Sequence, residues 1–157
     1  MKESIGLANE ELKRVDHLIY VSLKYTSTVD VIRSIIQRMV TAIEHMIDAQ
    51  IKHSQDTKKI VDIPNLPVEK CKLLKQLHPG DSVVVEMLDF YLHLRKILRA
   101  EFIPSQEFRR HVTMTVNLKD ETPIDINIDK INEFYEKVKK YYEHAIFTHE
   151  EAKKGSA

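Results

Sequence analysis

The chain is poor in the residues that punctuate or cross-link small folds. Its 157 residues include one cysteine, three glycines, five prolines and no tryptophan. The single cysteine, Cys71, cannot form a disulfide within the chain, and so few glycines and prolines disfavour a many-turned all-β fold. No apolar run approaches the roughly 20 residues that a membrane-spanning helix needs. We therefore expect one mainly helical domain over residues 1–157, built on a hydrophobic core.

The charges of the chain are balanced, with 24 Lys and Arg against 24 Asp and Glu. No global field is available to steer the protein toward nucleic acid or an anionic membrane, so a charged partner must meet a local patch. The first residues, MKESIGLANEELKR, lack the apolar core of a signal peptide. Together with the lone cysteine this predicts a protein of the reducing cytoplasm, with no membrane contact.

Apolar residues at intervals of three and four predict two long helices in the first third of the chain. The first extends from Lys2 to about Lys24. The second extends from a capping pair, Ser27 and Asp30, to about His53. The apolar stripe of the second helix is formed by Ile32, Ile35, Ile36, Met39, Ile43, Met46 and Ile47.

Two further helices are predicted in the middle of the chain. A short one begins at Pro67, which suits a first helical turn, and ends at His78. Asp81 or Ser82 can cap the next, which runs to about Phe102 before Pro104 closes the segment. Its core-facing stripe is formed by Val84, Met87, Leu88, Tyr91, Leu94 and Leu98.

The hydrophobic period changes from helical to alternating over about residues 110–128, which predicts a β-hairpin. Asp129 can cap a last helix that ends near Glu151, before a frayed tail at 152–157. The expected fold is mainly α: an antiparallel bundle of four to five helices with one β-hairpin before the last helix. The hairpin either covers one end of the bundle or offers a strand edge to another chain.

Basic residues are concentrated around the end of the fourth predicted helix. Arg95 and Arg99 lie at the edge of its apolar stripe, and Arg109, Arg110 and His111 follow after a short loop. Guanidinium groups placed in this way could converge on a phosphate or a carboxylate. The alternative is that Arg95 lays its stem over the core and pairs with an acid on a neighbouring helix.

The order of these helices resembles the HEPN superfamily, whose helical domains occur in RNA-cleaving toxins and beside nucleotidyltransferases. Two long antiparallel helices, a short helix and a fourth helix with a tyrosine, a Leu-Arg pair and further basic residues carry the likeness. It covers roughly residues 3–102 and 129–150. The resemblance implies a helical module associated with RNA or nucleotides.

The catalytic motif of that family is an arginine followed after four to six residues by a histidine, and Arg95 matches the arginine. Positions 100–102 read Ala, Glu and Phe, so the matching histidine is missing. The resemblance therefore implies a non-catalytic member, or one whose histidine comes from elsewhere, with His111 as the nearby supplier.

A second arginine–histidine pair with suitable spacing is Arg38 and His45 in the second predicted helix. At 100° per residue the two lie about 20° apart on the helix surface. Both lie opposite the apolar stripe, which favours an ordinary solvated face. If a dimer buried this face, His45 could act as a general base and Arg38 could stabilise a pentacoordinate phosphate.

The chain has little that suggests a metal or cofactor site. His144 and His149 are five residues apart and point away from each other on a helix, and there is no cysteine pair. Neither a glycine-rich phosphate loop nor a Gly-x-Ser-x-Gly elbow is present. We expect neither a metal nor a cofactor.

The last predicted helix is rich in aromatic residues, namely Phe134, Tyr135, Tyr141 and Tyr142. With the neighbouring lysines they could form a stacking platform for bases. Their helical spacing favours a place in the core instead.

These patterns predict a cytoplasmic, HEPN-like, homodimeric binding or interaction module without covalent chemistry. RNA, a nucleotide or a partner protein would be bound by Arg95, Arg99, Arg109, Arg110 and His111. One alternative is a metal-independent endoribonuclease that uses an Arg/His pair drawn from Arg38, His45 and His111. Another is a purely structural dimer or scaffold.

Overall fold

The computed structural model of the chain describes residues 2–57, 62–119 and 121–155. Along the described chain the elements are α1 (Lys2–His17), the π-helix η1 (Leu18–Ser22), α2 (Leu23–Tyr25), α3 (Val29–Asp56), α4 (Pro67–Leu77), α5 (Ser82–Arg99), β1 (Glu101–Ser105), β2 (Thr113–Asn117), β3 (Ile124–Ile126) and α6 (Ile128–Gly155).

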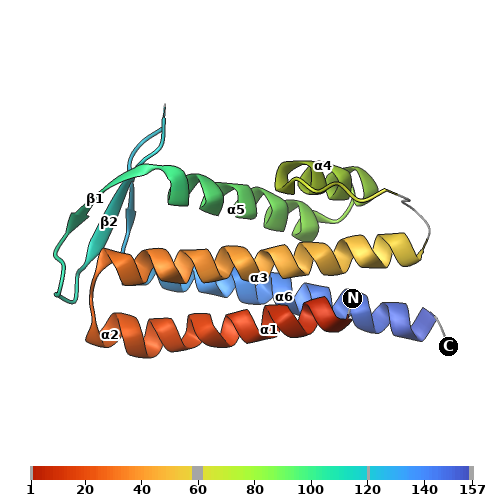
Figure 1. Cartoon of the computed structure of the whole chain (residues 1–157), viewed down its shortest axis with the longest axis horizontal. Coiled ribbons are helices and arrows are strands. Elements are labelled where there is room, and N and C mark those ends of the chain that lie inside the picture. Colours follow the sequence, from red (N-terminus) through yellow and green to blue (C-terminus); the bar gives the residue numbers. More distant parts are fainter. Residues whose placement is uncertain (1, 58–61, 120, 156–157) are drawn as a thin grey trace.

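The long helices lie side by side as a bundle, with the small sheet at one end and α4 beside α5 at the other (Figure 1). Helix α3 is the centre of the bundle, because it packs against α1, α4, α5 and α6. Its apolar stripe is almost completely buried, including Ile32, Ile35, Ile36, Met39, Ile43 and Met46 at 0% exposure. The predicted mainly helical bundle is confirmed.

The β region is a three-stranded antiparallel sheet in the order β1-β2-β3, one strand more than the predicted hairpin. The prediction carried the fourth helix to Phe102, but α5 ends at Arg99 and Ala100 already has extended backbone, with ψ of 157°. Phe102 pairs with Val116 across the β1–β2 ladder. Pro104, which was expected only to close a helix, is tolerated here because β1 is an edge strand.

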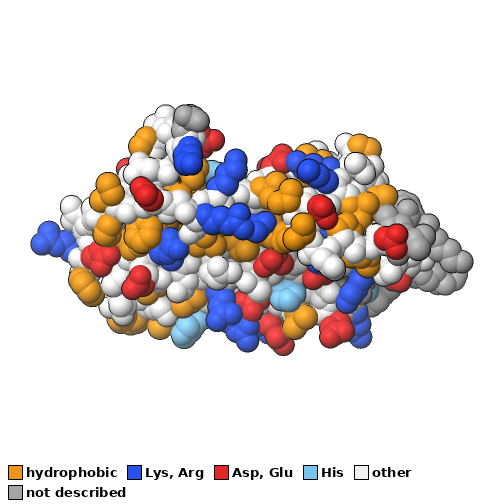
Figure 2. All heavy atoms as spheres, turned by 45° about the horizontal axis from the view of Figure 1, so that its top comes forward, with side chains coloured by type: hydrophobic (Ala, Val, Ile, Leu, Met, Phe, Trp, Pro, Cys, Tyr) orange, Lys and Arg blue, Asp and Glu red, His pale blue; other side chains and the backbone are white. Residues whose placement is uncertain are grey.

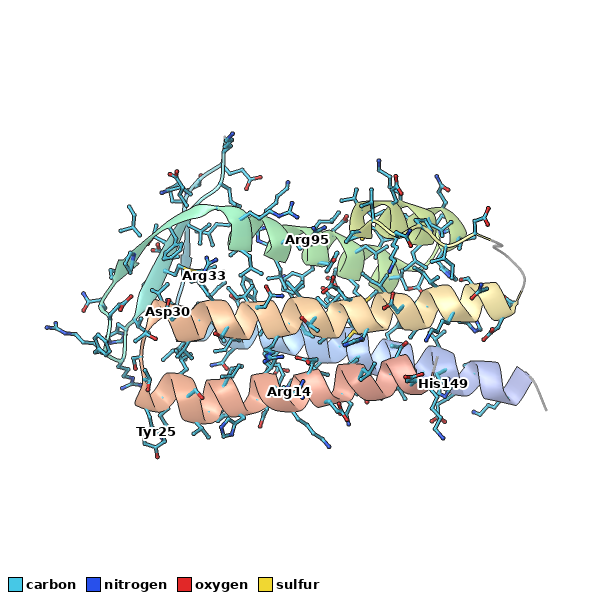
Figure 3. All side chains as sticks on the ribbon, in the orientation of Figure 1. Arg14, Tyr25, Asp30, Arg33, Arg95 and His149 are labelled. Atoms are coloured by element: carbon cyan, nitrogen blue, oxygen red, sulfur yellow. The ribbon has the colours of Figure 1, made fainter. Side chains whose placement is uncertain are left out.

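One arginine joins the helix bundle to the sheet. The guanidinium of Arg33, on α3, donates to the carbonyl oxygen of Leu98 at 3.0 Å and lies 4.8 Å from the ring centroid of Phe102. It therefore contacts both the last turn of α5, where the helix dipole favours a cation, and the first residues of β1. Figure 3 places Arg33 between α3 and the sheet.

The start of α3 is capped by Thr28, not by the predicted Ser27. The Thr28 hydroxyl accepts from the backbone amide of Val31 at 3.4 Å. Ser27 instead donates its hydroxyl to the carbonyl of Leu23 at 3.2 Å, and so belongs to the end of the preceding helix. The capping pair of Ser27 and Asp30 was therefore placed one residue too early.

The start of α6 is also capped by a neighbour of the predicted residue. Asn127, not Asp129, accepts from the backbone amide of Lys130 through its Oδ1 atom at 2.9 Å. Asp129 is in the first helical turn. The helix continues to Gly155, past the predicted end at Glu151, so most of the expected tail is helical.

The cap of α5 is Asp81, one of the two predicted candidates. Its carboxylate accepts from the amides of Val83 and Val84, each at 3.1 Å, and lies 2.9 Å from Nε2 of His144 on α6. Burial alone would raise the pKa of Asp81, but these hydrogen bonds hold it below its usual value. The cap therefore also ties α5 to α6.

Candidate functional site

The structure separates the basic residues that the sequence placed together. Arg95 is half-buried on α5, with its guanidinium 5.6 Å from the ring centroid of Tyr91. Arg99 is exposed at the end of the same helix and lines a pocket of about 580 Å³ together with Lys96 and Lys119. Figure 2 shows Lys and Arg side chains gathered over α5 on this face of the molecule.

Arg109, Arg110 and His111 lie in the loop between β1 and β2, at the other end of β1. Five residues of strand span about 17 Å, so β1 carries this loop away from the end of α5. The prediction carried the helix to about Phe102 and expected only a short loop between it and Arg109. Because β1 is extended, the five residues are divided between two places, and His111 is not brought to Arg95.

The alternative for Arg95 named a stem over the core and an acid on a neighbouring helix. The side chain is half-buried, and its guanidinium carbon lies 5.6 Å from the ring centroid of the buried Tyr91. Among the described residues it forms no ion pair, so the acid expected on a neighbouring helix is not found.

The other end of the sheet holds a groove of about 830 Å³ that we call the aromatic groove. It lies where η1 and α2, the β1–β2 loop and the start of α6 meet. Its lining consists of Ile19, Tyr20, Lys24, Tyr25, Ser27, Phe108, Arg110, Ile128 and Asn132.

Three aromatic side chains of the aromatic groove are unusually exposed. Tyr20 is 58% exposed, Tyr25 78% and Phe108 77%. Figure 3 shows Tyr25 projecting from the end of α2, away from the bundle. Large aromatic side chains usually bury most of their surface, so three exposed rings around one hollow indicate a binding surface.

The electrostatics of the aromatic groove are one-sided. Lys24 and Arg110 supply two cations, and the lining includes no carboxylate. Neither cation forms an ion pair with a described residue. Both are therefore available to an anionic ligand.

The backbone around the aromatic groove is irregular on both sides. Phe108 has φ of 62° and Gln106 φ of 56°, a region that residues with a Cβ rarely adopt. The amide of Phe108 donates to the carbonyl of Ser27 at 2.6 Å, which holds the loop against the turn before α3. On the opposite wall, Tyr20 belongs to the π-helix η1, a distortion often found at functional sites.

Arg38 and His45, the alternative catalytic pair, do not form a site in the monomer. Arg38 lies 3.4 Å from a carboxylate oxygen of Glu11 on α1, and Glu11, only 6% exposed, also binds Arg14. The guanidinium of Arg38 thus helps to neutralise a buried acid. His45 is half-buried on the same helix.

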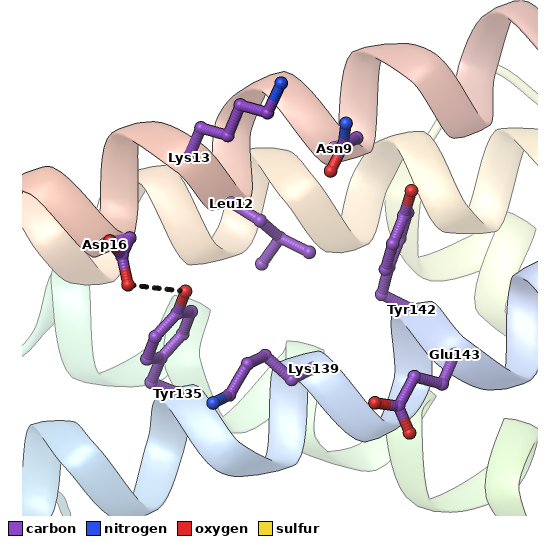
Figure 4. Close-up of a pocket in the computed structure, with 8 residues that line it drawn as sticks. All are labelled: Asn9, Leu12, Lys13, Asp16, Tyr135, Lys139, Tyr142 and Glu143. Carbon is purple, nitrogen blue, oxygen red and sulfur yellow. Dashed lines mark hydrogen bonds between the residues drawn. The ribbon is translucent and has the colours of Figure 1, made fainter.

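The aromatic residues of α6 belong largely to the core, as their spacing predicted. Phe134, Tyr135 and Tyr141 are at most 7% exposed, while Tyr142 is half-buried. Tyr135 and Tyr142 border a second groove, of about 360 Å³ between α1 and α6, which we call the helix groove (Figure 4). Its lining is completed by Asn9, Leu12, Lys13, Asp16, Lys139 and Glu143.

Three polar residues that line the helix groove, Asp16, Tyr135 and Lys139, are engaged by other residues of the chain. The hydroxyl of Tyr135 donates to Asp16 at 3.2 Å, and Lys139 lies 2.7 Å from Glu136 and 4.7 Å from the Tyr135 ring centroid. Burial and the nearby Asp16 carboxylate raise the pKa of Tyr135 to about 12. This groove is therefore a less favourable binding surface than the aromatic groove.

Within residues 2–57, 62–119 and 121–155, no cluster of three or more His, Cys, Asp and Glu residues could hold a metal ion. No helix in the same part of the chain is long and apolar enough to span a membrane. No protein-family model, curated protein sequence or solved structure matches this chain.

Proposed function

We propose that this protein is a binding module for single-stranded RNA and that the aromatic groove is its binding site. The observation that carries the proposal is the convergence of Tyr20, Tyr25 and Phe108 with Lys24 and Arg110 around one hollow without a carboxylate. Proteins that bind single strands combine aromatic rings, on which bases stack, with cations that contact the phosphates. The groove has both parts.

The proposal moves the expected binding site but keeps part of its residues. Arg110 lines the aromatic groove, and Arg109 and His111 flank it in the same loop. Arg95 and Arg99 lie beyond the other end of β1 and are not part of this site. A duplex is not the expected ligand, because paired bases are stacked on one another and cannot stack on Tyr25 or Phe108.

The test is the affinity for a fluorescein-labelled single-stranded RNA of about twelve nucleotides, within the usual range of site sizes, measured by fluorescence anisotropy. Tyr25→Ala and Phe108→Ala should each raise the Kd roughly 5- to 150-fold, since stacking contributes about 1–3 kcal/mol per base. Arg110→Ala should weaken binding most at low salt.

Matched controls distinguish the groove from the rest of the surface. Phe147→Ala removes another exposed aromatic ring, 60% exposed on α6, and Lys72→Ala removes an exposed cation on α4. Both should leave the Kd unchanged, as should Arg95→Ala. Equal losses in all variants, or no RNA binding by the unchanged protein, would contradict the proposal. Binding of an acidic protein instead would assign the groove to a protein partner.

The resemblance to the HEPN superfamily and the homodimer stay predictions, and RNA binding is consistent with the resemblance. The alternative of a metal-independent endoribonuclease is less favoured, because Arg38 is engaged by Glu11 and His111 lies away from Arg95. Incubating RNA with the protein in EDTA tests this alternative. Cleavage that is lost in His45→Ala or His111→Ala would support it.

A further inference from the structure

A small cavity of about 170 Å³ adjoins the aromatic groove. Arg110 and Ile128 line both, so the two hollows lie next to each other at these side chains. We call the smaller one the edge cavity. Its lining is completed by His111, Thr113, Asn127 and Asp129, from the β1–β2 loop, β2 and the start of α6.

The polar side chains of the edge cavity have unused hydrogen-bonding capacity. Asn127 accepts through Oδ1 from the amide of Lys130 at 2.9 Å, but its NH2 group has no acceptor among the described residues. The hydroxyl of Thr113 donates to the carbonyl oxygen of His111 at 2.9 Å, which leaves its oxygen as an acceptor. The exposed carboxylate of Asp129 forms neither an ion pair nor a hydrogen bond with a described residue.

A carboxylate beside a cation-lined groove has a cost for an RNA-binding surface, because it repels phosphate. It favours a ligand that presents hydrogen-bond donors at this position. Among the bases, guanine carries two neighbouring donors, N1–H and N2–H2, on its Watson–Crick edge, and a carboxylate can accept from both at once. The NH2 group of Asn127 can donate to the neighbouring O6 atom of the same edge.

The other bases fit this pattern less well. Uracil has one donor, N3–H, between two carbonyl oxygens that a carboxylate would repel. Adenine and cytosine each present a single exocyclic amine beside an acceptor nitrogen. None of the three offers the paired donors that match both oxygens of Asp129.

We propose that the edge cavity recognises the Watson–Crick edge of one guanine, with Asp129 accepting from N1–H and N2–H2, next to bases stacked in the aromatic groove. This inference rests on the proposed function. It makes the protein a reader of single-stranded RNA that contains guanine, with Asp129 as the residue that determines specificity.

Three short RNAs that differ in one base test the inference. Each is a labelled oligouridine of about six nucleotides with guanine, inosine or adenine at one central position. The base of inosine, hypoxanthine, is guanine without the N2 amine. The unchanged protein should bind the guanine RNA roughly 5- to 150-fold more tightly than the adenine RNA, the range expected of a good bidentate contact, with inosine in between.

Asp129→Asn keeps the shape of the side chain and removes the charge and one acceptor. It should bind the three RNAs with similar Kd values. Asp30→Asn is the matched control, because Asp30 is likewise an acidic residue in the first turn of a long helix, α3, but is not in the lining of the cavity. It should keep the preference for guanine. Thermal unfolding of both variants shows whether loss of the helix-terminal charge affects folding.

Each outcome decides between the two proposals. Equal binding of all three RNAs by the unchanged protein would refute guanine recognition while the RNA-binding function stands. A guanine preference that persists in Asp129→Asn would remove Asp129 as the specificity residue. If the unchanged protein bound none of the three RNAs, both proposals would be refuted together.

Discussion

The aromatic groove and the helix groove contain the same kinds of residue in different states. Each has two tyrosines and at least one lysine. In the helix groove, Tyr135 donates a hydrogen bond to Asp16 (Figure 4), and Lys139 forms an ion pair with Glu136. In the aromatic groove the rings are exposed and the cations have no acidic partner among the described residues. Tyr135 and Lys139 of the helix groove thus serve the structure, whereas the rings and cations of the aromatic groove are available to a ligand.

The largest expected effect is a difference in protein stability between variants of the two grooves. Tyr135→Ala should lower the free energy of unfolding by about 3 kcal/mol or more, because it leaves a cavity between α1 and α6. Tyr25→Ala should change it by no more than about 0.5 kcal/mol, since the ring is 78% exposed. Guanidinium unfolding followed by circular dichroism measures both. A similar loss in the two variants would show that Tyr25 is structural.

A smaller change sharpens the role of the Tyr135 hydroxyl. Tyr135→Phe should lower the free energy of unfolding by about 1 kcal/mol, the usual contribution of a hydrogen bond. The pKa of Tyr135 is raised to about 12, so its neutral form is favoured by folding. This contribution is fully present below the unfolded pKa of about 10 and is lost as the pH rises through about 12.

Urea unfolding at several pH values from neutral to strongly alkaline checks this pH dependence. The gap in stability between the unchanged protein and Tyr135→Phe should narrow between about pH 10 and 12. Lysines titrate in the same range, but they do so in both proteins. A constant gap would mean that burial and Asp16 do not raise the pKa of Tyr135 on folding.

The third effect concerns the strained loop of the aromatic groove. Phe108→Gly should raise the free energy of unfolding by up to about 1 kcal/mol, because glycine adopts a φ of 62° without a steric penalty. It should also weaken RNA binding, since the ring is lost. Phe108→Ala should weaken binding to the same extent without the gain in stability. A gain in Phe108→Ala as well would indicate that the exposed ring, not the backbone, is unfavourable.

The smallest effect contrasts the lysines of the two grooves. If Lys24 contacts a phosphate, Lys24→Ala should reduce the slope of log K against log salt by roughly 0.7, the value for one phosphate of a single strand. Lys139→Ala should leave the slope unchanged, because its charge is already balanced by Glu136. Anisotropy titrations over a range of salt concentrations give both slopes. Equal slopes in the two variants would place Lys24 away from the RNA backbone.

The helical part of the fold was predictable because its signals are local. The hydrophobic period, the capping residues and Pro67 in a first helical turn placed the ends of most helices within a few residues. This holds for α3, α4, α5 and α6 and for the start of α1. β1 was missed because the sequence Glu101–Ser105 does not alternate, and its pairing with β2 is a tertiary interaction. That missed strand is also why the basic residues were placed in one cluster.

The aromatic groove could be predicted only in part. Arg110 was identified by its charge, but Tyr20 and Tyr25 were passed over because they lie off the apolar stripe of the first helix. Phe108 gives no sequence signal, since an aromatic residue at positive φ runs against local preference. The sequence did offer one clue to the groove, because Tyr20 and Tyr25 are aromatic residues that lie off an apolar stripe. Their convergence depends on contacts between segments more than 80 residues apart, which no local pattern records.

The π-helix η1 makes the position of Tyr25 depend on chain length as well as on residue type. A π-helical turn accommodates one residue more than an α-helical turn. If the same residues formed regular α-helix without a deletion, every side chain after Ser22 would turn by about 100° relative to α1, the angle of one residue. A related chain with one residue fewer between Val15 and Tyr25 could therefore form regular α-helix and keep the direction of Tyr25, whereas a chain of equal length needs the π-helical turn to form the groove.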